Sequence, residues 1–321
     1  MLSVFVHRGG ETRGVDQIDP AWLAPDSGVR LWVDLAKPTD EELRILSDTF
    51  KFHELSVEDA RAAIHHPKVE WYNTYLYVIL HGINFQAARH RFSTRDVDFF
   101  VNPSFLVTVH DGSSRSIQRM REICPRHWQL LGEGTAALMH RIVDAMVDHY
   151  RPEVEKLQEK MDELERQVFG TPRQNLVRSI LALKRDVSSL RRVTLPQRDI
   201  IGRLGRREFS IIDEQVSYRF RDVYDNLVRL TDEALILQDR TTGLLDAHLS
   251  NTSNRLNEVM KALTLIATIF MPLTVLTGAF GMNVPLPRFP GTDGAQFWWI
   301  CGLMVAVGML LWGYFKNRKW L

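Results

Sequence analysis

Residues 262–280 read ALTLIATIFMPLTVLTGAF and contain no charged side chain. As a helix this run would be about 28 Å long, close to the thickness of the hydrocarbon core of a bilayer. A second uncharged run, FWWICGLMVAVGMLLWGYF, occupies residues 297–315 and opens with aromatic side chains that are typical of a membrane interface. The two runs predict transmembrane helices joined as a hairpin at the end of the chain.

Basic residues flank the two apolar runs but are scarce between them. They are Arg255 and Lys261 before the first run, and Lys316, Arg318 and Lys319 after the second. The link, residues 281–296, holds one basic residue, Arg288, and one acid, Asp293. Because basic flanks stay in the cytoplasm, both termini, including the tail 316–321, are expected inside. The N-terminal residues lack the basic-then-apolar order of a secretory signal, which also favours a cytosolic amino terminus. With the two apolar runs, we expect a multi-pass protein of the inner (plasma) membrane.

Residues 1–125 predict a cytosolic α/β domain. The segments 30–36, 75–85 and 96–109 carry strand-like apolar runs, and the last of them is expected to turn at Asn102–Ser104. Residues 39–50 predict a helix, because Thr39 can cap its N-terminus and acidic residues follow in the first turn.

Residues 126–206 predict an antiparallel helical hairpin. Apolar residues recur there at intervals of three and four, which indicates one buried face on each helix. They are Val154, Leu157, Met161, Leu164 and Val168, then Leu176, Ile180, Leu183, Val187 and Leu190. The sequence Gly170-Thr171-Pro172 is typical of a helix end followed by a helix start. Pro196 is expected to bend or end the second helix.

Residues 207–280 predict a single very long helix that begins near Ser210 and includes the first membrane span, 262–280. It would be roughly 100 Å long. Pro272, Gly243 and Gly278 are the only breakers in it. A helix of this length needs packing partners in water, and copies of the same chain are the expected ones.

One face of this helix is unusually polar for a packing seam. Stepping by three and four residues, the face contains Asp246, Ser250, Ser253, Asn257, Met260, Leu263, Met271, Thr274 and Gly278. A coiled-coil seam would prefer Leu, Ile or Val throughout. Two interpretations remain: an imperfect oligomer interface, or a pore wall in which polar rings alternate with apolar constrictions.

The tripeptide Gly281-Met282-Asn283 follows the first span, and Pro285 and Pro287 stop the helix beyond it. In a symmetric oligomer, Asn283 would form a ring of amide oxygens. Such a ring can bind the water shell of Mg²⁺, which loses its water reluctantly. The alternative is a simple turn between two spans, since Gly and Asn both favour turns.

At these residues the chain resembles the CorA family of divalent-cation channels, which includes CorA-like zinc transporters. The signature is Gly-Met-Asn after the first of two C-terminal spans, and the resemblance extends over residues 56–80, 221–227, 243–274 and 316–321. It implies a funnel-shaped homopentamer, an α/β cytosolic domain, a long stalk helix and passive cation flux.

The resemblance also implies roles for individual residues. It assigns selectivity to Gly281, Met282 and Asn283, and pore lining to Asp246, Asn257, Met260, Leu263, Met271, Thr274 and Gly278. Asp59 and Asp222 match two carboxylates that bind a regulatory cation between neighbouring copies; taken alone, both would be ordinary solvated acids.

The outer loop departs from the family pattern. Many magnesium channels of the family carry an acid soon after the Asn, whereas this loop has Arg288 and only a later acid, Asp293. We therefore expect a broad channel for Mg²⁺ that also carries Co²⁺, Ni²⁺ or Zn²⁺. The alternative is a CorA-like zinc transporter of the ZntB type, with or without proton coupling.

Other function classes have weaker support. Residues 132–137 contain a G-x-G-x-x-A pattern, but no clear strand precedes it. His65-His66 could bind a metal, but adjacent residues on a helix or strand rarely share one ion, and Pro67 follows. His140, Asp144 and Asp148 share a helix face that is interpreted as a surface face. We therefore expect no enzyme and no catalytic cofactor. A membrane-anchored coiled-coil scaffold remains a remote alternative.

Composition bears on two further classes. The net charge is +1, with 40 basic and 39 acidic side chains spread along the chain, so no nucleic-acid-binding face is indicated. Cys124 and Cys301 lie too far apart in sequence to suggest a disulfide framework. The expected partners are copies of the chain, the lipid bilayer and divalent cations.

Overall fold

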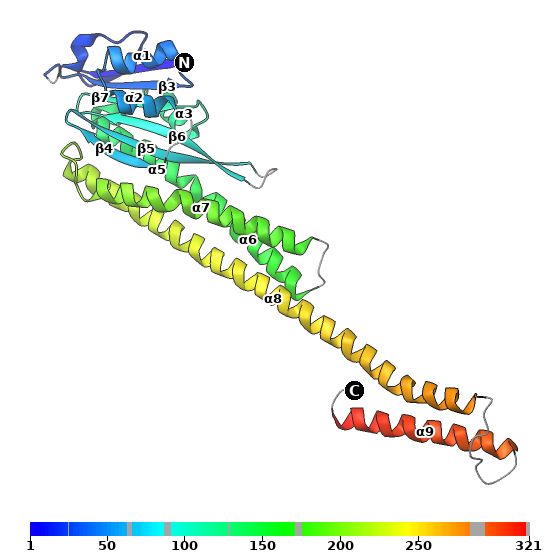
Figure 1. Ribbon diagram of the computed structural model, residues 1–321. Coiled ribbons are helices and arrows are strands. Elements are labelled where there is room, and N and C mark those ends of the chain that lie inside the picture. The colour runs from blue at the N-terminus through cyan, green and yellow to red at the C-terminus, as the bar shows by residue number, and fades with distance from the viewer. Residues whose placement is uncertain are drawn as a thin grey trace. The chain divides into compact units, whose positions relative to one another are not determined.

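A computed structural model gives the fold of the chain (Figure 1). It describes residues 1–24, 26–62, 66–86, 91–127, 129–170, 175–282 and 293–318. The chain divides into two compact units, Met1–Leu245 and Asp246–Leu321. The division falls inside helix α8 (Glu214–Phe280), so each unit is considered by itself.

A seven-stranded sheet forms the centre of the first unit. Its strands are β1 (Leu2–Arg8), β2 (Glu11–Val15), β3 (Arg30–Ala36), β4 (Lys68–Tyr72), β5 (Tyr75–Gln86), β6 (Arg91–Val101) and β7 (Phe105–His110). Their order is β2-β1-β3-β7-β6-β5-β4. Only the central pair, β3 and β7, is parallel, and residues of both strands are buried almost throughout because helices cover both faces.

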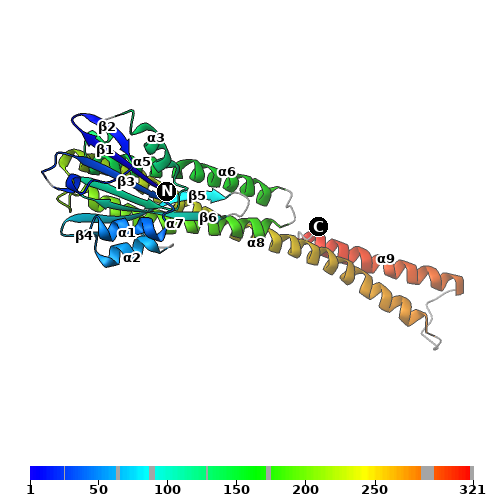
Figure 2. The same ribbon diagram turned by 90° about the horizontal axis from the view of Figure 1, so that it is seen from above.

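Short helices cover the sheet (Figure 2). They are η1 (Pro20–Leu23), α1 (Asp40–Asp48), α2 (Glu54–Arg61), α3 (Arg115–Ile123), α4 (Gln129–Gly132) and α5 (Thr135–Asp148). Leu43 and Leu46 of α1 and Val57 of α2 join one core with the sheet residues. α5 packs against β3, β5, β6 and β7. As predicted, Thr39 caps α1, and a reciprocal bond from Glu42 completes a capping box.

Helices α6 (Tyr150–Phe169) and α7 (Leu176–Gly205) pack along the first part of α8. The buried residues of both helices include the two predicted apolar seams. Gly170 follows the end of α6 as predicted, whereas Thr171 and Pro172 lie outside the described residues.

Pro196 does not end α7, which continues to Gly205. A proline inside a helix costs about 3 kcal/mol or more. The turns that follow it are nevertheless retained, because Ile200, Ile201 and Leu204 are buried. Packing of these side chains outweighs the missing hydrogen bond.

The second unit contains residues 246–280 of α8 and helix α9 (Asp293–Asn317). α9 begins four residues before the expected start at Phe297. The two helices lie side by side in both views (Figures 1 and 2). Residues that are partly buried recur every three or four positions on each helix. They include Leu265, Ile269, Pro272 and Leu276 on α8, and Cys301, Met304, Gly308 and Leu311 on α9.

Candidate functional site

The polar face predicted for the long helix lies on α8 of the second unit. Asp246, Asn257, Met260, Leu263, Met271, Thr274 and Gly278 are all exposed. At 100° per residue, this face lies roughly opposite the partly buried face defined by Leu265 and Pro272. α9 therefore does not cover the polar face, and a single copy of the chain leaves it open.

Large apolar side chains are exposed along both helices of this unit. Met271 on α8 is 69% exposed and Trp298 on α9 is 74% exposed. Both helices are long and apolar enough to cross a membrane, and in the described structure their most apolar windows have no buried residue. Water is a poor solvent for such surfaces, so lipid or further copies must cover them.

The predicted selectivity tripeptide is described only in part. The Gly281 N–H donates to the carbonyl oxygen of Thr277 at 2.9 Å, so helical bonding extends just past the end of α8. A Cβ at Gly281 would lie 3.0 Å from that same oxygen, which explains the glycine. Met282 is exposed. Asn283 and Arg288 lie outside the described residues, and Asp293 is the first residue of α9.

Asp59, predicted to be a regulatory carboxylate, already has a cationic neighbour. It lies on α2 and accepts a hydrogen bond from Lys68 on β4, whose amino group also contacts Glu70 at 3.2 Å. Burial alone would lower the pKa of Lys68, but the bonds to Asp59 and Glu70 outweigh burial and raise it. Lys68 therefore stays charged and neutralises Asp59 within one chain. The sequence spacing gave no signal for this pair, because the two residues lie on different elements, helix α2 and strand β4.

Asp222 lies on α8 and is exposed. Its electrostatic neighbour is Asp144 on α5. Burial raises the pKa of Asp144, and the negative charges of Asp148 and Asp222 raise it further. Three carboxylates thus repel one another on neighbouring helices, a potential that a cation would relieve. Sequence reasoning missed the link between Asp144 and Asp222, which are far apart in the chain.

The interpretation of His140 as a surface residue is wrong. His140 lies on α5, is only 8% exposed, and packs edge-on against Phe220 of α8. Burial lowers its pKa to about 4, so it is neutral at physiological pH. The apolar periodicity of α5 did not reveal that His140 is buried, because His140 is a polar residue that α8 covers.

The remaining sequence candidates show no assembled site. The G-x-G-x-x-A pattern lies where α4 meets α5, after a helix instead of a strand. His66 is exposed, and His65 lies outside the described residues. Among the residues that the structure describes, no group of three or more His, Cys, Asp or Glu side chains is arranged to hold a metal ion.

Comparison with known proteins gives consistent results. The family model described as CorA-like Mg²⁺ transporter protein matches residues 27–317. The chain is 32% identical to YfjQ of Bacillus subtilis, named as a candidate metal ion transporter, over 95% of this chain and 92% of that protein. It is 30% identical to the cobalt/magnesium transport protein CorA of Thermotoga maritima, over 92% and 85% of the two chains.

A solved structure shows the same fold. The complete CorA magnesium transporter from Methanocaldococcus jannaschii superposes with a TM-score of 0.83 at 21% identity. The match covers 100% of this chain and 99% of that one, so it includes the α/β part, the long helix and both C-terminal helices.

Proposed function

The chain belongs to the CorA-like Mg²⁺ transporter family, and from this premise we propose that it forms a homopentameric channel in the plasma membrane. Membership makes it a divalent-cation transporter. The ion, the direction of flux and the pore residues belong to the proposal: Mg²⁺ enters passively along the axis of the pentamer, and both termini are cytoplasmic.

The observation that carries the proposal is the open polar face of α8. The face contains Asp246, Asn257 and Thr274 together with apolar Met260, Leu263 and Met271, and α9 lies on the opposite side of the helix. Copies related by rotation would enclose this face around an axis while lipid covers the exposed apolar side chains of α9. Polar rings can hold a hydrated cation, and the methionine and leucine rings can close by dewetting.

Selectivity is assigned to the ring formed by Gly281, Met282 and Asn283. The amide oxygen of Asn283 would accept hydrogen bonds from water bound to Mg²⁺. Recognition through a water shell discriminates weakly among divalent ions of similar hydrated size. We therefore propose that Co²⁺, Ni²⁺ and Zn²⁺ also pass, and that Arg288 weakens cation attraction at the mouth.

Flux into proteoliposomes tests the function. A potassium diffusion potential, negative inside, should drive Mg²⁺ uptake by purified protein, and Asn283→Ala should reduce this uptake at least about tenfold without loss of the oligomer. Asn254→Ala is the matched control, because Asn254 is exposed on α8 but lies off the polar face. Equal uptake by Asn283→Ala and wild type would leave Asn283 as a turn residue.

The same vesicles distinguish the zinc alternative. A ZntB-like transporter would carry Zn²⁺ in preference to Mg²⁺ and would respond to an imposed pH gradient. The proposed channel should carry both ions, respond to voltage, and be indifferent to the pH gradient.

A further inference from the structure

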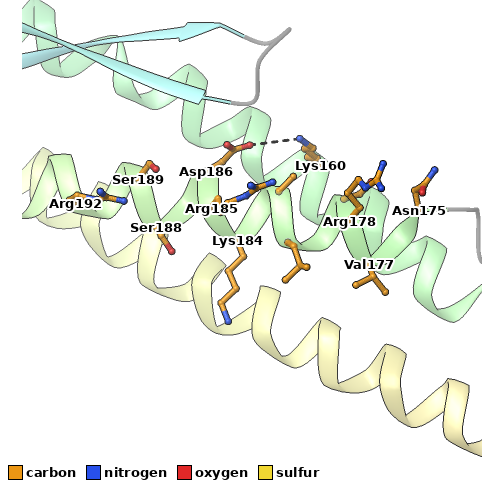
Figure 3. Close-up of a pocket in the computed structure, with 13 residues that line it drawn as sticks. Lys160, Asn175, Val177, Arg178, Lys184, Arg185, Asp186, Ser188, Ser189 and Arg192 are labelled. Atoms are coloured by element: carbon orange, nitrogen blue, oxygen red, sulfur yellow. Dashed lines mark ion pairs between the residues drawn. The ribbon is translucent and has the colours of Figure 1, made fainter.

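Helix α7 carries an exposed stripe of arginines. Arg178, Arg185 and Arg192 follow one another at intervals of seven residues, so they lie on one face of the helix. All three are exposed, and none makes an ion pair with any residue in the described ranges. They line a groove of about 1520 Å³ that runs along α7 (Figure 3).

The groove has an excess of positive charge. Lys184 and Lys160 also line it, and Asp186 is the only carboxylate among the described residues that line it. Asp186 is 98% buried at the side chain and faces Lys160 at 3.9 Å, as the dashed line in Figure 3 shows. Val177 and Leu181 add partly exposed apolar surface beside the arginines. A partner for this groove should therefore present acids on a surface long enough to follow a helix.

Helix α6 of the same chain presents such a surface. Glu155, Glu159 and Glu163 are exposed at intervals of four residues, and none makes an ion pair with a described residue. Their neighbours Asp162 and Glu165 are different, because both bind Arg240 of α8. The glutamates thus form an acidic stripe without a cationic partner in the described structure.

The two stripes cannot meet within one chain. On α7 the arginine stripe lies roughly opposite the buried seam represented by Leu183 and Val187. On α6 the glutamate stripe lies roughly opposite the seam represented by Leu157 and Met161. Since the seams pack the two helices into the bundle, both stripes point away from it.

The register of the stripes is complementary. The contact between Lys160 and Asp186 sets these residues level with each other on antiparallel helices. Counting from it, Arg185 is level with residue 161, and Arg192 is level with residue 154. Glu159 and Glu155 therefore lie within about 3 Å of the levels of Arg185 and Arg192 along the helices.

We propose that the arginine stripe of α7 in one copy binds the glutamate stripe of α6 in the next copy. The inference rests on the proposed function, because it needs a ring of copies around an axis that follows α8. Met161 and Arg191 both contact α8, at Thr241 and Gln238, so α6 and α7 run along that helix. A rotation about the axis leaves the position of each residue along that axis unchanged. Arg192 therefore meets Glu155 of the neighbouring copy, and Arg185 meets Glu159. Such a head-to-tail interface closes into a ring.

Crosslinking tests the contact directly. Arg192→Cys and Glu155→Cys are placed in the full-length chain with Cys301→Ala, and detergent-purified protein is treated with a short bismaleimide. Cys124 can remain, because it is buried and burial raises the pKa of its thiol to about 12. The expected result is a ladder of covalent oligomers. The control pairs Arg192→Cys with Glu11→Cys, an exposed residue of β2, and should give no ladder.

Charge reversal tests the energetics. Arg185→Glu with Arg192→Glu should raise the protein concentration at which the oligomer half-dissociates by roughly tenfold at low salt. Glu155→Arg with Glu159→Arg should do the same, and all four changes together should restore wild-type assembly. The control, Arg8→Glu with Arg13→Glu on the exposed β1–β2 hairpin, should leave assembly unchanged.

The outcomes separate this inference from the proposed function. An intact oligomer that gives no ladder and tolerates both reversals overturns the inference and leaves the channel standing. Wild-type protein that never forms a ring overturns both. If no ladder forms and Arg185 is protected from an arginine reagent only in nanodiscs containing anionic lipid, the stripe binds headgroups and the inference is wrong.

Discussion

Lys68 binds a carboxylate, Asp59, for which the family resemblance implies a regulatory role. Its amino group binds Asp59 and Glu70 and lies 5.4 Å from the centre of the Tyr77 ring. If Asp59 and Asp222 of neighbouring copies share a cation, as we propose from the family resemblance, that cation must compete with Lys68. The lysine then keeps the site from filling at low internal metal concentrations.

Lys68→Met should therefore make inhibition by internal Mg²⁺ more sensitive. Removing the competing charge leaves Asp59 free to bind metal, so half-maximal inhibition of flux is expected at a concentration several-fold lower. Asp222→Asn should act in the opposite direction, and Asp225→Asn, at an exposed position on α8, serves as its control. Uptake into proteoliposomes loaded with graded concentrations of internal Mg²⁺ gives the measurement. Unchanged inhibition in both Lys68→Met and Asp222→Asn would place the regulatory site elsewhere.

Asp98 is a second residue whose charge depends on its surroundings. It is 6% exposed and accepts a hydrogen bond from Tyr77 at 2.6 Å. Burial raises the pKa of Asp98 to about 7, against the hydrogen bond from Tyr77, which lowers it. In an unfolded chain the pKa is about 3.9. A raised pKa stabilises the folded state at low pH, and this contribution is lost as pH rises towards 7.

Asp98→Asn should accordingly flatten the dependence of stability on pH. Between pH 5 and pH 8 the wild-type chain should lose roughly 2–3 kcal/mol through this group, and the variant should lose none of it. Thermal unfolding of the full-length protein followed by tryptophan fluorescence at both pH values provides the measurement. Asp16→Asn, at an exposed position, should retain the wild-type slope. An equal slope in all three proteins would contradict the assignment.

At the scale of elements, α7 joins the sheet to the long helix. Gln197 accepts a hydrogen bond from the backbone N–H of His81 on β5 at 3.0 Å and donates to Tyr150. Tyr150 in turn donates to the carbonyl oxygen of His81 at 2.8 Å. The pairing of β4 with β5 reaches only to Ile79, so no residue of β4 lies opposite His81. The side chains of Gln197 and Tyr150 therefore bind the N–H and carbonyl groups of His81 on this edge of β5, which would otherwise lack partners.

Close approach of α7 to α8 depends on small residues. A Cβ at Gly202 would lie 3.0 Å from the ring of Tyr224, and one at Gly205 would lie 3.2 Å from Arg221. Both distances are tighter than ordinary contact. The two glycines therefore allow the helices to cross at this level.

Gly202→Val should destabilise the first unit by about 1–3 kcal/mol, because the added side chain overlaps Tyr224. Gly243→Ala is the matched comparison: this glycine also lies inside a helix, but nothing lies within 4 Å of its Cβ position. It should stabilise α8 by about 0.5–1 kcal/mol. Chemical denaturation would contradict the close-contact argument if the two variants shifted the free energy of unfolding equally.

At the scale of the whole molecule, charge and apolar surface separate along the chain. The first unit buries its apolar residues in a core, whereas the second unit exposes Phe270, Val275 and Leu310, among other large side chains. Basic residues flank the spans, and the link carries only Arg288. A bilayer satisfies both features when the termini are cytoplasmic.

Labelling of intact cells tests this topology. With Cys301→Ala as background, Gly291→Cys should react with an impermeant maleimide added outside, and Lys319→Cys should react only after the membrane is opened. Cys124 remains in both variants as a buried internal control. The reverse pattern would refute the orientation.

Local patterns in the sequence determined much of this protein. The segment 30–36 is β3, and the predicted turn at Asn102–Ser104 joins β6 to β7. The seams of α6 and α7 and both apolar helices also follow from periodicity and composition, because each is a property of neighbouring residues. The Gly-Met-Asn motif pointed to the family, which the comparisons confirm. The pore and regulatory roles of individual residues stay predictions.

Tertiary structure alone decided which side chains meet. The placement of helix α2 beside strand β4 brings Asp59 to Lys68. Packing of α8 on α5 buries His140 and sets Asp222 near Asp144, and buried contacts carry α7 through Pro196. The paired residues lie on different elements of the chain, and the helix continues through Pro196 against the local preference of proline. Their pairing depends on how whole elements dock, and docking energy is spread over many weak contacts that no short stretch of sequence encodes.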